Sequence, residues 1–169
     1  AVAAGALDRA AALLEEASAT CVAVDDRLGL AQSLRGLGDV CYWRGERSQA
    51  AVLYREAHEL FQVVGKAGDV AQSLWSLGYV ELERGELDGA RELFSQQRAL
   101  CRKVRDRLGE ANADNALGEL ARRSGKLDLA EQHYRAALRI ATKSGLSRRW
   151  IFLLNLAHAR LARGEAAGA

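Results

Sequence analysis

The chain has 169 residues, a formal net charge of +2 and an apolar content of 49%. This composition suffices for a folded core, but no apolar run is long enough to cross a bilayer and no secretory signal peptide is visible. Three cysteines stand far apart, at Cys21, Cys41 and Cys101. We expect small buried thiols there, and a reducing, cytoplasmic location.

A glycine recurs at a fixed interval along the chain. Gly5, Gly45, Gly85 and Gly125 are each separated by 40 residues. An alanine follows each glycine five residues later, at Ala10, Ala50, Ala90 and Ala130. The last interval, from Gly125 to Gly164, is 39 residues. A fixed period of this kind indicates an array of repeats, each a pair of helices joined at the glycine.

Apolar residues at helical spacing predict a helix on each side of every turn. The expected bounds are 6–23, 30–44, 47–63, 70–84, 87–104, 109–124, 127–143 and 147–163. The chain 1–169 is then one repeat domain, with units at about 30–64, 70–104 and 109–143 between two single helices. Asp8, Ser48, Asp88 and Asp128 stand near the starts of alternate helices, where we expect them to cap free backbone N–H groups. Because methionine is absent and the chain stops soon after Gly164, we expect a piece of a longer array.

The central unit reads Leu74-x2-Leu77-Gly78-x2-Glu81, followed by Ala90-x3-Phe94. This pattern resembles the tetratricopeptide repeat, W-x2-L-G-x2-Y and then A-x3-F. The resemblance implies an all-α, right-handed α-solenoid of antiparallel helix pairs, whose first helices line a concave groove. With its longer period, the array is similar to those of MalT-like and AfsR-like bacterial regulators, and to long-repeat adaptors of the kinesin light chain type.

No constellation of residues suited to catalysis or metal binding stands out. The chain contains no C-x-x-C, no H-E-x-x-H and no phosphate-binding G-x-x-x-x-G-K-[ST] motif. His58, His133 and His158 lie in different repeats without a neighbour at ligand spacing. We therefore expect neither an enzyme nor a cofactor.

The helix face that the resemblance places in the groove carries aromatic and polar side chains. The predicted groove residues are Gln32, Arg35, Asp39, Tyr42, Trp43, Gln72, Trp75, Tyr79, Asn112, Asn115, Glu119, Arg122 and His158. Trp75 and Tyr79 are four residues apart, so they share one face and form the expected centre of a binding surface. The alternative is that these aromatic side chains pack against neighbouring repeats.

Two features at the C-terminal end suggest contacts with other molecules. The run from Trp150 to Leu154, which includes Phe152, is apolar on every side of a helix and predicts self-association or a covering partner. Residues 122–169 carry a charge balance of +7. We expect this charge to lie on solvated helix faces, because no nucleic-acid recognition module is visible.

These observations predict a scaffold or sensor segment of a larger, bacterial regulatory protein that binds a protein or peptide in its groove. The alternative is a segment that senses a small-molecule effector such as a sugar, as the resemblance to MalT-like arrays implies.

Overall fold

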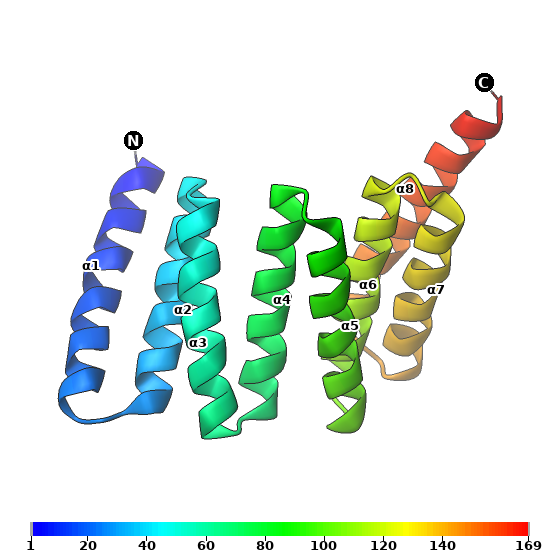
Figure 1. Ribbon diagram of the computed structural model, residues 1–169. Coiled ribbons are helices and arrows are strands. Elements are labelled where there is room, and N and C mark those ends of the chain that lie inside the picture. The colour runs from blue at the N-terminus through cyan, green and yellow to red at the C-terminus, as the bar shows by residue number, and fades with distance from the viewer. Residues whose placement is uncertain (1, 169) are drawn as a thin grey trace. The chain divides into compact units, whose positions relative to one another are not determined.

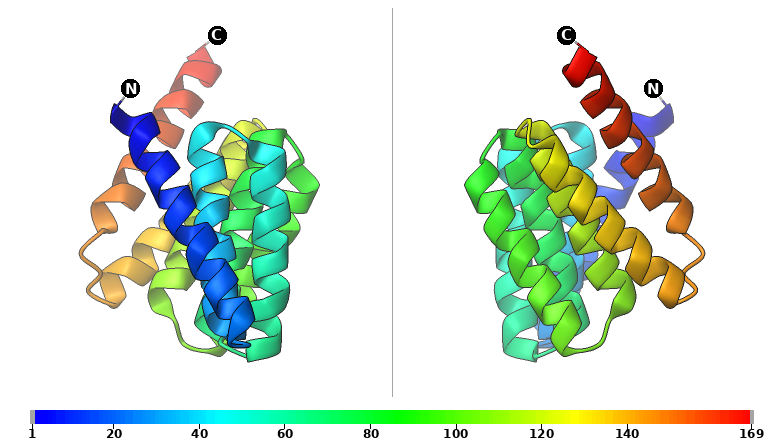
Figure 2. Two further views of the ribbon diagram at one scale, coloured as in Figure 1. Left: turned by 90° about the vertical axis from the view of Figure 1, so that its left-hand side faces the viewer. Right: turned by 90° about the vertical axis from the view of Figure 1, so that its right-hand side faces the viewer.

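The computed structural model describes residues 2–168, with side chains from 5 to 164. This part of the chain contains helices and no strand, which confirms the predicted all-α class (Figure 1). The helices are α1 (Val2–Ala23), α2 (Arg27–Arg44), α3 (Arg47–Val64), α4 (Ala67–Arg84), α5 (Leu87–Lys103), α6 (Arg107–Arg123), α7 (Leu127–Lys143) and α8 (Arg149–Gly168). They divide into two compact units, Ala1–Gly85 and Glu86–Ala169, called here the N-terminal and C-terminal units. Within each unit, consecutive helices run antiparallel (Figure 2).

The turns between paired helices close on glycines in the left-handed conformation. Gly45 ends α2 with φ 85°, and its N–H donates to the carbonyl oxygens of Cys41 and Tyr42. A side chain is strained at such a φ, which explains why glycine recurs there. Two of the predicted turn glycines are different, because Gly5 lies inside α1 and Gly164 inside α8. Both have alanine-rich surroundings, and one helical glycine costs only about 1 kcal/mol relative to alanine.

The predicted helix caps are wrong by one or more residues. The residues that precede α3, α5 and α7 are Glu46, Glu86 and Lys126, and none of them makes a side-chain cap hydrogen bond. Ser48, Asp88 and Asp128 lie inside the first turns of those helices, and Asp8 lies within α1. Three of these four residues instead form ion pairs: Asp8 with Arg44, Asp88 with Arg91 and Asp128 with Arg163.

Side-chain caps are present at the starts of α2 and α6. Asp26 accepts a hydrogen bond from the Gly29 N–H at 2.9 Å, and Asp106 accepts one from the Gly109 N–H at the same distance. A Cβ at Gly109 would lie 2.5 Å from the Sγ of Cys101, so the cap, the glycine and the thiol form one packed turn. Cys41 and Cys101 are buried as predicted, and Cys21 is half-buried; all three thiols are free.

Small residues allow the paired helices to approach closely. The ring of Tyr54 packs on Gly38, and the ring of Tyr134 packs on Gly118. In the C-terminal unit, Ala121, Ala130, Tyr134, Leu156 and Ala159 form one core cluster. A second cluster joins Phe152 to Ala111, Ala137 and Ala141. Phe152 is only 1% exposed, so the prediction that it contributes to an outward apolar surface is wrong. None of the described helices is apolar over a length that could span a bilayer.

Gly118→Ala is expected to lower the free energy of unfolding by about 1–2 kcal/mol, because overpacking a core outweighs the gain in helix propensity. The added Cβ would lie 2.6 Å from the Tyr134 ring, which is itself buried. Gly68→Ala is the matched control, since nothing lies within 4 Å of a Cβ at that helical position. Urea denaturation of both variants checks the prediction, and equal stabilities would contradict the close contact.

Candidate functional site

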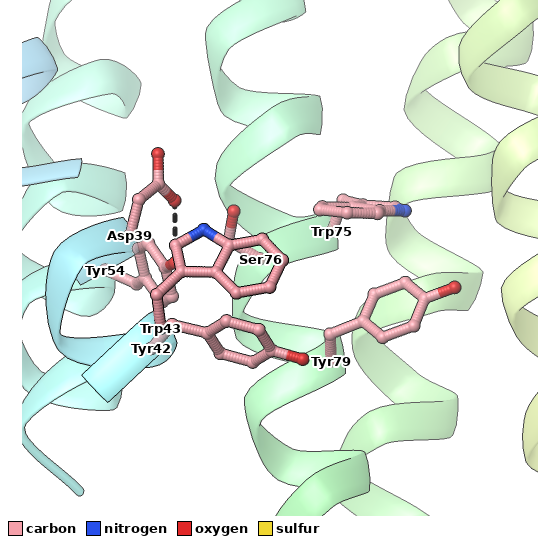
Figure 3. A pocket seen from close by; sticks show the side chains of 7 residues that line it. All are labelled: Asp39, Tyr42, Trp43, Tyr54, Trp75, Ser76 and Tyr79. Atoms are coloured by element: carbon pink, nitrogen blue, oxygen red, sulfur yellow. Dashed lines mark hydrogen bonds between the residues drawn. The ribbon is translucent and has the colours of Figure 1, made fainter. Parts of the chain in front are cut away.

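Seven residues of the N-terminal unit surround a cavity of about 200 Å³, called here the aromatic cavity. They are Asp39, Tyr42 and Trp43 from α2, Tyr54 from α3, and Trp75, Ser76 and Tyr79 from α4. Tyr42 and Trp43 extend from α2 toward the side chains of α4 (Figure 3). α2 and α4 are the first helices of two successive repeats, and the repeat period is 40 residues. Equivalent faces of the two helices therefore lie next to each other.

The aromatic rings contact one another in two pairs. The ring centroids of Trp75 and Tyr79 are 4.6 Å apart, and those of Tyr42 and Trp43 are 5.7 Å apart in an edge-to-face arrangement. The Arg47 guanidinium lies 4.2 Å from the centroid of the Tyr42 ring, and it also donates to the Tyr42 carbonyl oxygen. These contacts orient the rings before any ligand arrives. Trp43 nevertheless remains 73% exposed, which leaves a large apolar surface open to a partner.

One wall of the cavity carries a hydrogen-bonded carboxylate. The Tyr54 hydroxyl donates to Oδ1 of Asp39 at 2.7 Å (Figure 3). Burial raises the pKa of Tyr54, and the adjacent Asp39 carboxylate raises it further, so the hydroxyl stays protonated. Asp39 Oδ2 lies 3.7 Å from the Arg35 guanidinium, and the carboxylate side chain is 45% exposed. Asp39 can therefore accept a hydrogen bond from a ligand N–H group.

The predicted groove residues of this unit thus fall into two sets. Asp39, Tyr42, Trp43, Trp75 and Tyr79 line the aromatic cavity, and Arg35 joins it through Asp39. Gln32 and Gln72 are exposed on the same helices but do not line it. Tyr54 and Ser76 were not predicted, because both occupy buried positions of the repeat. One feature of the sequence does point to Tyr54. The central repeat has Phe94 at the equivalent position, so the tyrosine adds a buried hydroxyl, which needs a hydrogen-bond partner nearby.

The C-terminal unit holds a smaller set of polar groups around a pocket of about 250 Å³, called here the polar pocket. Its lining residues are Glu119, Arg122, Tyr134, Asn155 and His158. Asn115 joins this group because the Asn155 amide donates to its Oδ1 at 2.8 Å. Asn112 is half-buried and does not line the pocket. Three predicted residues therefore meet here, and Asn115 lies beside them.

Glu119 is the hub of the polar pocket. Its carboxylate accepts hydrogen bonds from Arg122 at 2.9 and 2.7 Å, from Arg123 at 2.9 Å and from the Tyr134 hydroxyl at 3.2 Å. The Arg122 guanidinium, with help from Arg123, lowers the pKa of Glu119 to about 2 despite partial burial. These two arginines are already engaged, so the pocket offers fewer free donors than its sequence suggests.

The pKa of Glu119 predicts a loss of stability in acid. The unfolded chain takes up a proton near the ordinary pKa of 4.5, whereas the folded chain does so only near 2. The stabilising contribution is therefore complete above pH 4.5 and is lost as the pH falls toward 2, and its size is up to about 3 kcal/mol. Glu119→Gln should be less stable than the wild type at pH 6 and closer to it at pH 3 in urea denaturation. A constant difference between the two pH values would contradict this assignment.

Part of the positive charge near the C-terminal end is neutralised within the fold. Arg135, Arg160 and Arg163 approach the buried carboxylate of Glu131 at 2.8, 2.7 and 2.6 Å. These arginines are held by an internal partner, which weakens the case for a nucleic-acid surface there. Among the described side chains, no group of three or more histidine, cysteine or acidic residues could hold a metal ion.

The comparisons with known proteins agree with this architecture. A tetratricopeptide repeat family model matches residues 69–143, whereas no curated protein sequence matches the chain. The apo form of RapI has a TM-score of 0.84 at 18% identity, covering 94% of this chain and 58% of its own. The Rap conjugation gene regulator of the plasmid pLS20, in complex with the Phr* peptide, has a TM-score of 0.72 at 17% identity, covering 83% and 40%. TPR-like repeats of a Podosopora anserina chain assigned as a kinesin light chain have a TM-score of 0.75 at 19% identity, covering 95% and 81%.

These likenesses show the fold class, an all-α chain of tetratricopeptide-type helix pairs. This chain spans 58% of the length of RapI and 40% of that of the pLS20 regulator.

Proposed function

We propose that this chain is a protein- or peptide-binding scaffold or sensor segment of a larger regulatory protein, without catalytic activity of its own. The observation that carries the proposal is the aromatic cavity. Four aromatic side chains on α2 and α4 lie around it in fixed orientations, although the pairing of helices does not require them there. Rigid aromatic area next to a hydrogen-bond acceptor is typical of the residues that dominate binding energy.

The dimensions of the cavity favour one anchoring side chain of an extended partner. A volume of about 200 Å³ is of the order of a single large side chain. Trp43 and Trp75 can cover that side chain, and Asp39 can accept a backbone N–H from the same segment. The presence of a peptide in the solved pLS20 regulator, a protein of similar fold, supports the proposal by analogy of fold only.

We place the chain in a bacterial regulator of the MalT-like or AfsR-like kind on the strength of its 40-residue period, as one continuous repeat domain. The three free thiols fit a reducing, cytoplasmic location. Self-association through α8 would use Trp150 and Leu154, which are 60% and 48% exposed, but not the buried Phe152.

A selection from a displayed library of random linear peptides tests the function. Peptides enriched on the wild type should bind it in solution and should bind the Trp75→Ala variant much more weakly. Trp150→Ala is the matched control, because this exposed tryptophan lies in the other unit. Enrichment that is equal on wild type and on a Trp75→Ala/Tyr79→Ala double variant would contradict the proposal.

A sugar effector is the second candidate, because apolar aromatic walls with a few polar groups also suit small ligands. The salt dependence of binding distinguishes a peptide ligand from a sugar ligand. Binding of a peptide whose charges approach Arg35 and Asp39 should weaken as sodium chloride is raised, whereas binding of an uncharged sugar should not. Titration of a panel of neutral mono- and disaccharides at two salt concentrations, with the intrinsic tryptophan fluorescence of the chain as the signal, decides between them.

A further inference from the structure

A second cavity of the C-terminal unit, of about 290 Å³, shares no lining residue with the polar pocket. It lies among α5, α6 and α7, and it is called here the arginine cavity. Its lining residues are Arg98, Arg102, Glu110, Asp114, Leu129, Gln132, His133, Ala136, Arg139 and Ile140. Glu110 and Asp114 are one turn apart on α6, whereas Glu119, the hub of the polar pocket, lies on nearly the opposite face of that helix.

A buried ionic cluster forms the floor of the arginine cavity. Oδ1 of Asp114 accepts a hydrogen bond from Arg98 at 3.0 Å and lies 3.1 Å from Nδ1 of His133. The Asp114 side chain is only 7% exposed. Because a carboxylate only accepts hydrogen bonds, Nδ1 of His133 carries a proton. Glu110, 11% exposed, pairs with Arg107 at 2.8 Å and with Arg102 at 3.5 Å.

The same positions are apolar in the two preceding repeats. Subtracting 40 and 80 from Glu110 gives Val70 and Leu30, from Asp114 gives Leu74 and Leu34, and from His133 gives Leu93 and Leu53. In the N-terminal unit, Leu34 packs against the core of Ala31, Ala57 and Phe61. The scaffold therefore accommodates leucine where Asp114 lies.

Replacing buried and partly buried apolar residues by an ionic cluster does not favour stability. A buried ion pair loses hydration, and well-packed apolar side chains of similar volume are commonly as stable or more stable. Positions that depart from the local rule of a fold are often functional positions. The third repeat thus carries three such departures, and all three line one cavity.

The free groups of the cavity determine the charge of its ligand. Both carboxylates are already paired with arginines or histidine. Among the side chains that the structure describes, no hydrogen bond or ion pair engages Arg139 or Gln132, and Arg102 is 68% exposed. The open capacity is therefore for acceptors. Leu129, Ala136 and Ile140 add an apolar wall, which suits a short aliphatic stem.

We propose that the arginine cavity binds a carboxylate on a short aliphatic stem, either a free dicarboxylic acid or a glutamate or aspartate side chain of a partner. The planar guanidinium of Arg139 can bind the carboxylate in a bidentate manner. Asp114 holds Arg98 and His133 in place, and is a positioning residue rather than a ligand. This site is separate from the aromatic cavity and does not depend on its function.

Calorimetric titration at constant ionic strength tests the proposal with three probes: glutarate, an acetylated and amidated triglutamate peptide, and inorganic phosphate. Saturable binding of glutarate or the peptide is expected, and Arg139→Gln should weaken it about tenfold or more, the effect of one charge-assisted hydrogen bond. Arg55→Gln, an exposed arginine on α3 in the other unit, should leave it unchanged. Tighter binding of the peptide than of glutarate identifies a partner side chain, and equal binding identifies a free acid.

Three results would overturn the proposal: no saturation with either carboxylate probe, equal binding by Arg139→Gln, or equal binding of phosphate, which would indicate charge alone. The double variant Asp114→Leu/His133→Leu gives a second test that does not involve Arg139. It places leucine at both positions, as the first repeat does with Leu34 and Leu53. It should melt at or above the wild-type temperature and lose glutarate binding. A lower melting temperature with unchanged binding would show that the ionic cluster is structural.

Discussion

Truncating Trp75 or Tyr79 to alanine is expected to weaken binding of a selected peptide about thirtyfold, a loss of about 2 kcal/mol, with little change in melting temperature. The two rings contact each other at 4.6 Å and line the aromatic cavity, and both side chains remain partly exposed. Losing either ring removes apolar contact with the partner and leaves the other ring less well oriented. Fluorescence titration gives the affinities, and melts recorded on the same samples give the stabilities.

Leu77→Ala is the control for this experiment. Leu77 belongs to the same helix but is only 5% exposed, so its truncation should lower the free energy of unfolding by about 2–5 kcal/mol. If both aromatic variants bind the peptide like the wild type, the binding surface lies elsewhere. If both melt as early as Leu77→Ala does, the two aromatic side chains act as core residues.

Ala130→Glu is expected to unfold the C-terminal unit, with a loss of more than about 4 kcal/mol, because it forces an unpaired charge into the core. Ala130 is fully buried, and its neighbours Ala121, Leu156 and Ala159 offer no hydrogen bond. Circular dichroism at 222 nm and the melting temperature measure the effect.

Ala99→Glu makes the same change at an exposed position of α5 in the same unit. This variant should melt within a few degrees of the wild type, since surface substitutions of this kind alter stability by about 0.5 kcal/mol or less. Equal melting temperatures for Ala99→Glu and Ala130→Glu would mean that the repeat register described here is wrong.

The helix pairs were predictable from the sequence because their signals are local and repeated. Gly38 and Gly118 mark the close contact, and Tyr54 and Tyr134 fill it. Exact helix ends were less predictable. The repeat period predicts a turn at Gly164. In the structure, however, α8 continues through this residue. The period alone cannot show whether a glycine ends a helix, because that depends on the packing of the helix that follows.

One candidate site was predictable from local sequence spacing, and the other was not. Trp75 and Tyr79 were predicted to share a surface because residues four apart always share a helix face. The arginine cavity could not be predicted in this way, because its ionic cluster joins residues that are distant in the sequence. Asp114 and Arg98 are 16 residues apart in the chain, and only the packing of α5 against α6 brings them within 3.0 Å.

The indole N–H signals of the three tryptophans test the central claim most directly. Trp43 and Trp75 line the aromatic cavity, whereas Trp150 is exposed in the C-terminal unit and serves as an internal reference. Each signal can be assigned in a ¹H–¹⁵N NMR spectrum by replacing one tryptophan at a time with phenylalanine. On titration with a selected peptide, the signals of Trp43 and Trp75 should shift and saturate together while that of Trp150 stays in place. A titration in which only Trp150 shifts, or in which a tightly bound peptide moves neither Trp43 nor Trp75, would contradict a binding site in the aromatic cavity.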